Sequence, residues 1–228
     1  MDDAQPAASA PLTTKADLTR EERLIRYARG RVDRVWGRQI VTLSGSAVLA
    51  VLVSPVAGLA ALLVTLAGEL VDTRYLRGVP ERIAACEPVG WLASGSAATA
   101  ALQAACISFC AILSIAVPEA LSPLFPMAYL AGAALNAGFV MPFAPEAARA
   151  RLGVYATTAA IIMGIAAVRR DGLDMGWMLD LGGSLFLVYM TFQSLAFVRK
   201  GSERHSRALA TLVAHQRMLE EARAELAR

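Results

Sequence analysis

Charge is scarce in this sequence, and it is missing altogether from long stretches of the middle. Only 18% of the 228 residues are charged, against 56% that are hydrophobic, whereas an average globular chain carries roughly 25% charged residues. The charges gather in the two ends and in short connections. This segregation excludes an ordinary water-soluble domain and predicts an all-α polytopic membrane protein whose partner is the lipid bilayer. A formal net charge of +3 is too small to indicate a nucleic-acid partner.

Cysteine and histidine are also few, with three and two residues. The number of cysteines is odd, and they do not show the spacing pattern of a small disulfide-rich secreted domain. Structural disulfides are therefore not expected. Cys106 and Cys110 are four residues apart and share one helical face, which makes them weak candidates for binding a soft metal ion. Because no third or fourth ligand lies within reach in the sequence, we interpret them as packing residues. The sequence does not indicate a cofactor.

Intervals without charge locate the predicted membrane spans. The first such interval runs for 30 residues between Arg38 and Glu69, and Pro55 interrupts it. A single helix of that length would measure about 45 Å, which exceeds a hydrocarbon core of ~30 Å, so we predict a hairpin at Ser54–Pro55. We assign residues 38–198 to a six-span transmembrane domain. The spans are predicted at Trp36–Val53, Val56–Tyr75, Val89–Val117, Leu121–Phe143, Leu152–Val168 and Met175–Val198.

Lysine and arginine set the orientation of these spans. With six spans, 20 of the 22 basic residues fall on one side, and only Arg169 and Arg170 fall on the other. Basic residues concentrate in cytoplasmic segments, so both termini are predicted to be cytoplasmic, in a bacterial inner membrane. No early apolar core with a cleavage site is visible in the first 35 residues, and the first span is expected to act as the insertion signal.

The N-terminal segment divides into two parts. Residues 1–16, rich in Ala, Pro, Asp and Thr, are predicted to be a disordered tail. Residues 17–37 are predicted to form a basic amphipathic juxtamembrane helix that begins with a capping box of Thr19 and Glu22. Two interpretations of this helix stay open. It rests on anionic lipid headgroups and transmits motion, or it is simply a basic anchor on the cytoplasmic side.

A seven-residue repeat marks the C-terminal segment, residues 199–228. Leu212, Leu219 and Leu226 recur every seven residues, and a second series that includes His215 runs three residues out of phase. This pattern predicts a cytoplasmic coiled-coil linker and a homodimer whose seam comprises Leu212, His215, Leu219 and Leu226. The alternative is a solvated helix without a partner. No Gly, Asn or Pro closes the pattern before Arg228, so we expect the helix to lead into a further domain.

The C-terminal part of the chain resembles the input half of multi-span sensor histidine kinases from bacteria, in particular proteobacteria. The resemblance rests on the exit from the last span at Val198-Arg199-Lys200 and on the Glu/Ala/Arg-rich run from Arg207 to Arg228. The resemblance implies a signalling helix that leads into the helix carrying a phospho-accepting histidine. His205 and His215 lack the acidic residue and the proline that follow such a histidine, and Gly-rich nucleotide boxes are absent. The chain thus shows no catalytic residues, and the kinase chemistry is expected beyond Arg228.

The same kind of linker precedes diguanylate and adenylate cyclase domains, which are the alternative outputs. A different class is a small oligomeric transporter or channel. The leading prediction is a sensory input domain that relays a stimulus through its sixth span and the coiled coil to an output domain outside this chain.

Polar residues inside the spans are costly in lipid and are candidates for ligand binding or sensing. Glu69, with Asp72 and Arg74 nearby, is interpreted either as a switching carboxylate or as an interfacial glutamate paired with an arginine of a neighbouring helix. Gln103, Asn136, Tyr189 and Gln193 either converge on a polar pocket or form separate interhelical hydrogen bonds.

Overall fold

In the computed structural model, the described residues are 19–33, 35–116, 122–169 and 175–226. They form seven α-helices and contain no strand, which confirms the predicted all-α class. The predicted tail at residues 1–16 lies outside these ranges. The helices are α1 (Arg20–Asp33), α2 (Val35–Leu52), α3 (Pro55–Ala84), α4 (Val89–Ser114), α5 (Leu124–Val140), α6 (Pro145–Arg169) and α7 (Met175–Leu226).

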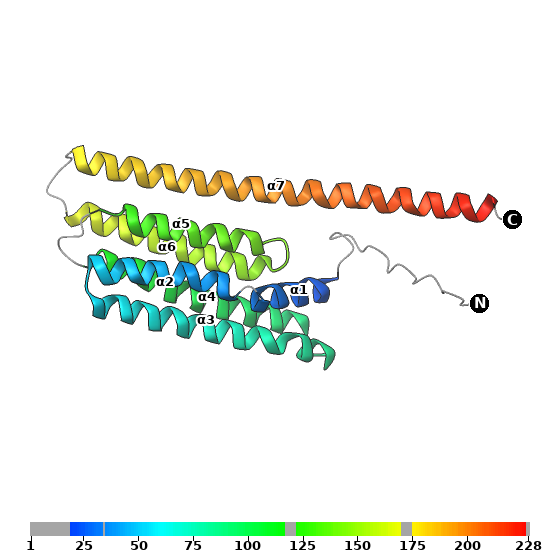
Figure 1. The fold of residues 1–228 in the computed structure, drawn as a ribbon, viewed down its shortest axis with the longest axis horizontal. Helices are drawn as coiled ribbons and strands as arrows, with labels where there is room; N and C mark the ends of the chain where they lie inside the picture. The colour runs from blue at the N-terminus through cyan, green and yellow to red at the C-terminus, as the bar shows by residue number, and fades with distance from the viewer. Residues whose placement is uncertain (1–18, 34, 117–121, 170–174, 227–228) are drawn as a thin grey trace, which may run out of the picture.

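Helices α2 to α7 run up and down in one bundle (Figure 1). The α2–α3 hairpin lies at one end, whereas α1, the α3–α4 turn and the α5–α6 turn lie at the other, and α7 runs out past this second end. Helix α3 packs between α2 and α4, α4 packs on α6, and α7 lies along α5. The positions predicted to be cytoplasmic thus share one end of the bundle.

Five helices, α2, α3, α4, α6 and the first part of α7, are long and apolar enough to cross a membrane. They indicate a membrane-embedded protein. Helix α5 is apolar but has only 17 residues, which gives a length of about 25 Å against a hydrocarbon core of ~30 Å. The sixth span therefore stays a prediction.

The predicted break at Ser54–Pro55 is confirmed, and its cause is local. The Ser54 hydroxyl accepts a hydrogen bond of 3.1 Å from the Ala57 backbone N–H, and Pro55 occupies the first turn of α3. A hydroxyl before a helix and a proline at its start are both favourable, since neither leaves a backbone donor unpaired. Beyond the turn, α2 and α3 approach so closely at Gly58 that a Cβ there would lie 2.5 Å from the Ala50 Cβ.

Two helices extend beyond the predicted membrane spans. Helix α3 continues to Ala84, past the predicted span limit at Tyr75, and α6 begins at Pro145, before the predicted limit at Leu152. The charges at Arg74 and Arg77 do not end α3, because both residues are exposed on its outer face. The predicted span limits Val117 and Leu121 lie outside the described residues.

The N-terminal helix is amphipathic as predicted, but its apolar face lies on the protein and is not free to bind lipid. The capping box is present, with Thr19 and Glu22 each accepting a hydrogen bond from the other's backbone N–H. Leu24, Tyr27 and Ala28 are buried in one apolar cluster together with residues of α3, α4 and α6. Helix α1 ends at Asp33 and α2 begins at Val35, and residue 34 between them lies outside the described residues. One helix over residues 17–37 that runs on into the first span therefore stays a prediction.

The glycine at the α2–α3 contact gives a test of this packing. We expect Gly58→Ala to lower the thermal midpoint of the full chain in detergent, because the added methyl group meets the Ala50 Cβ at 2.5 Å and the Ser46 carbonyl oxygen at 2.7 Å. Overpacking of this kind costs about 1–3 kcal/mol, which exceeds the helix-propensity gain of about 1 kcal/mol. Gly164→Ala on α6 is the control, because a methyl group there meets nothing within 4 Å. Equal effects of the two substitutions would contradict the packing.

Candidate functional site

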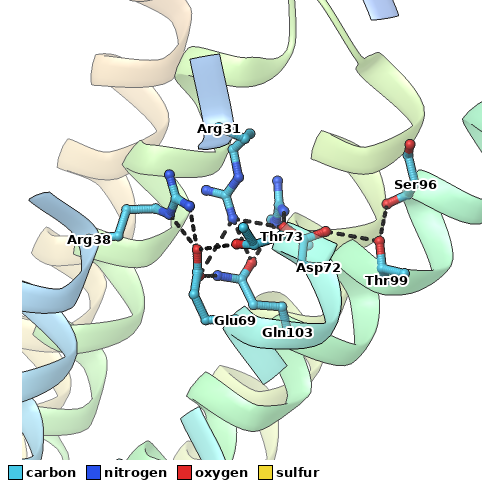
Figure 2. Close-up of polar contacts among 9 residues, drawn as sticks. Arg31, Arg38, Glu69, Asp72, Thr73, Ser96, Thr99 and Gln103 are labelled. Atoms are coloured by element: carbon cyan, nitrogen blue, oxygen red, sulfur yellow. Dashed lines mark hydrogen bonds and ion pairs between the residues drawn. The ribbon is translucent and has the colours of Figure 1, made fainter. Parts of the chain in front are cut away.

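A buried cluster of charged and polar side chains joins the helices where α1 meets the bundle (Figure 2). Two carboxylates of α3 stand at its centre, and three guanidinium groups reach them from three other helices. Ion pairs of this kind connect α1, α2, α3 and α6, while α4 adds neutral hydrogen-bonding groups. The members are Glu69, Asp72 and Thr73 of α3, Arg31 of α1, Arg38 of α2, Thr99 and Gln103 of α4, and Arg151 of α6.

Asp72 is fully buried and has a partner for each carboxylate oxygen. Its Oδ2 atom accepts hydrogen bonds from Arg31 Nη2 at 3.0 Å and from Arg151 Nη2 at 2.8 Å. Its Oδ1 atom accepts a hydrogen bond of 2.9 Å from the Thr99 hydroxyl. A carboxylate removed from water needs opposite charges and hydrogen bonds in compensation. Asp72 thereby ties α1, α4 and α6 to α3.

Glu69 lies one helical turn away and has its own set of donors. Arg38 donates to Oε1 from Nε at 3.0 Å and also from Nη2, and the Thr73 hydroxyl contacts the same oxygen at 3.4 Å. The Gln103 amide donates to Oε2, and Arg31 Nη2 lies 3.8 Å from that atom. Because Glu69, Asp72 and Thr73 are spaced three and four residues apart, they share one face of α3.

Gln103 connects the two carboxylates. Its carbonyl oxygen accepts hydrogen bonds from Arg31 Nη2 at 3.0 Å and from Arg151 Nε at 3.1 Å, while its amide nitrogen donates to Glu69. Every polar atom of the side chain therefore has a partner of the complementary kind. Helix α4 comes close enough for these bonds beside Gly68, where a Cβ would lie 2.8 Å from the Cys106 side chain.

Arg31 Nε is a buried donor at the cluster without a hydrogen-bond partner among the described residues. The Tyr27 hydroxyl lies beside the Arg151 guanidinium group and interacts with it. Burial, only partly opposed by the nearby Arg151 charge, raises the pKa of Tyr27 above its usual value of 10.0. The phenol consequently keeps its proton and remains a donor.

The structure brings together two of the five residues predicted as sensing candidates, Glu69 and Gln103. Asn136 on α5 lies in the wall of the cavity beside the cluster. Tyr189 and Gln193 do not converge with them. Both are exposed on α7, where Gln193 Nε2 donates to the Tyr189 hydroxyl at 2.9 Å. Of the two interpretations of Glu69, the structure shows the pairing with an arginine of another helix.

From the sequence, the three cluster arginines are predicted only as basic residues on the cytoplasmic side. For Arg31 a signal was available, because it continues the series Leu24, Tyr27 and Ala28 at helical spacing along the buried face of α1. Arg151 likewise precedes Tyr155 and Thr158 on the buried face of α6. A basic residue in phase with buried apolar residues indicates a charge that points into the protein.

The ion pairs and hydrogen bonds of this cluster hold the helices together, and we call the cluster the charge clamp. Each carboxylate is bound by guanidinium groups, and neither histidine nor cysteine is a member of the cluster. Within the described ranges, no group of three or more His, Cys, Asp or Glu residues comes together to hold a metal ion. Cys106 is half-buried and Cys110 is buried, which fits packing residues.

Comparison with known proteins gives no further assignment, because no family model, curated protein or solved structure matches this chain.

Two ion pairs of α1 allow a matched test of the clamp. We expect Asp72→Asn to destabilise the full chain by about 3–5 kcal/mol, because two buried guanidinium groups lose their shared counter-charge. Glu146→Gln is the control. It removes the 3.2 Å pair between Arg20 of α1 and Glu146 of α6, whose side chains are 57% and 42% exposed, and such a pair contributes at most about 1 kcal/mol.

Thermal unfolding in detergent measures both changes, and hydrogen exchange of the α1 amides shows whether this helix detaches. Similar losses of stability in the two variants, or unchanged exchange of α1 in Asp72→Asn, would contradict the clamp.

Proposed function

We propose that this chain is a membrane-embedded sensory input module with six spans and both termini in the cytoplasm of a bacterial cell. Its output helix is α7, which passes a change in helix packing to a domain beyond Arg228. A histidine kinase is the leading candidate for this domain, on the resemblance carried by the C-terminal segment. Diguanylate and adenylate cyclases are the alternative outputs.

The observation that carries this proposal is the uninterrupted length of α7. The helix has 52 residues from Met175 to Leu226, or about 78 Å at 1.5 Å per residue. A hydrocarbon core is only ~30 Å thick. The apolar part ends at Val198, and the remaining residues continue for about 42 Å without a break. A continuous helix of this kind transmits a rotation or shift from the membrane to its far end.

The packing of α7 also supports movement relative to the bundle. Helix α5 is its main contact, whereas α1, α3, α4 and α6 are joined by the buried charge clamp. In its apolar part, Phe186, Phe192 and Phe197 are 60%, 75% and 77% exposed. These side chains face lipid or a second copy, and the contacts within the chain that oppose a displacement of α7 are mainly those with α5.

The far part of α7 has the exposed seam that a dimer requires. Leu212 and Leu219 are 65% and 61% exposed in the single chain, and His215 is exposed between them. The Leu226 side chain is outside the part that the structure describes. Leucines at seven-residue spacing are stable in water when a second helix covers them, so a parallel homodimer is part of the proposal.

A small transporter or channel is the second candidate, since a cavity opens beside the arginine cluster. In that case the far part of α7 would only hold subunits together. The two candidates differ in whether the rotational phase of α7 matters for output.

The proposed dimer seam is tested by cysteine cross-linking in membranes. In a chain whose native cysteines are replaced by alanine, we expect Leu212→Cys and Leu219→Cys to form disulfide-linked dimers efficiently, because seam residues of parallel helices face each other. Ala214→Cys, on the outer side of the repeat, is the matched control and should form several-fold fewer dimers. Equal cross-linking at positions 214 and 219 would argue against this seam.

The signalling role is tested by changing the phase of α7. The full chain is joined after Arg228 to the catalytic half of a reporter histidine kinase, and alanines are inserted after Lys200. An insertion of three or four residues should switch or abolish the reporter phosphorylation, because it changes the rotational position of the seam relative to the bundle. Seven residues should restore the original level, because they return the helix to nearly the same phase. Output that does not depend on the length of the insertion would exclude signalling through α7.

A further inference from the structure

Two adjoining cavities open beside the charge cluster, between the α1–α2 segment and α5. Their volumes are about 470 and 270 Å³, and they share the lining residues Arg31, Arg38, Asn136 and Phe139. The larger lies within the range of about 300–1,000 Å³ that is usual for ligand pockets. Gly30 and Gly37 line it, and a Cβ on either would meet nothing within 4 Å, so the space beside them is open.

The charge around these cavities is strongly unequal. Four arginines line them, while Glu69 is the one carboxylate among the described lining residues. Asp72 behind them adds a second negative charge, which leaves two positive charges in excess. Arg26 is exposed, so water screens its charge. The buried excess is then one positive charge, from three guanidinium groups against two carboxylates. The arginines are Arg26, Arg31, Arg38 and Arg151.

The buried polar atom of the cluster that lacks a hydrogen-bond partner is likewise a donor on a positively charged side chain. Arg31 is 6% exposed, and its buried Nε donor has no partner among the described residues. Buried donors are nearly always paired in folded proteins. The acceptors nearby are already used, because Glu69 and Asp72 each receive several hydrogen bonds. A group that supplies acceptor oxygens and one negative charge would satisfy both deficits.

We propose that these cavities bind the singly charged phosphate group of a phosphodiester. Guanidinium groups suit this ligand because their fixed fork of N–H donors matches phosphate oxygens. The larger cavity is also lined by Phe139, Val140 and Phe143, which provide an apolar surface for the hydrocarbon part of the ligand. The phosphodiester comes from an anionic phospholipid headgroup or from a soluble molecule. This site does not depend on the signalling proposal, since a transporter would have the same cavity.

Binding is measured on the full chain in detergent by thermal stabilisation and by native mass spectrometry. The lipid arm compares phosphatidylglycerol with phosphatidylcholine, whose headgroup has no net charge. The soluble arm compares dimethyl phosphate with sodium chloride at equal ionic strength. Stabilisation by phosphatidylglycerol alone supports a lipid headgroup, and stabilisation by dimethyl phosphate supports a soluble ligand.

Two pairs of variants connect binding to this cavity. Tyr27→Phe removes a hydroxyl from a residue that lines the larger cavity, and affinity should fall about ten-fold for a lost hydrogen bond to a charged group. Tyr189→Phe, on the exposed face of α7, is its control. Arg26→Gln should likewise weaken binding, whereas Arg29→Gln, on the same helix but outside both cavities, should not.

The proposal is overturned if neither phosphatidylglycerol nor dimethyl phosphate stabilises the chain more than its control. It is also overturned if Arg29→Gln and Tyr189→Phe weaken binding as much as Arg26→Gln and Tyr27→Phe. Equal effects would mean that the ligand responds to the general positive charge of the surface.

Discussion

The buried carboxylate of Asp72 constrains this structure more than any other side chain. It lies on α3 with no exposure to solvent, and the guanidinium groups of Arg31 and Arg151 both bind its Oδ2 atom. An unpaired charge in such a place costs several kcal/mol, so neither arginine can leave without a large penalty. These ion pairs hold α1 and α6 to α3, in addition to the packing of α1 on α3 and of α6 on α4. Glu69 extends the same constraint to α2 through Arg38.

The clamp divides the molecule into parts that are held with different strength. Helices α1, α3, α4 and α6 share buried charges and an apolar cluster around Leu76 and Leu92, which fixes them as one body. Helix α7 contacts mainly α5 and leaves most of its apolar residues uncovered. A long helix that contacts mainly one neighbouring helix can move relative to the rest of the bundle. The cavities beside the clamp, between the α1–α2 segment and α5, are lined by four arginines and, among the described lining residues, by one carboxylate.

Local features of the fold were predictable because their causes lie within a few residues. The hairpin at Ser54–Pro55 follows from one hydroxyl and one proline, and the start of α1 follows from Thr19 and Glu22. The ends of α3 and α6 were not predictable in the same way. Charged residues such as Arg77 mark the limit of an apolar interval, but a helix continues past that limit when neighbouring helices cover one of its faces.

The sequence by itself indicated a membrane-embedded protein, because long intervals without charge are unstable as exposed segments in water. It also determined the turn at Ser54–Pro55, and it placed Glu69 among the residues that need a partner. Only the tertiary structure decided which of the many arginines supply that partner. Arg31, Arg38 and Arg151 are far apart in sequence, and a pairing between helices depends on which faces meet after packing, which no local pattern records.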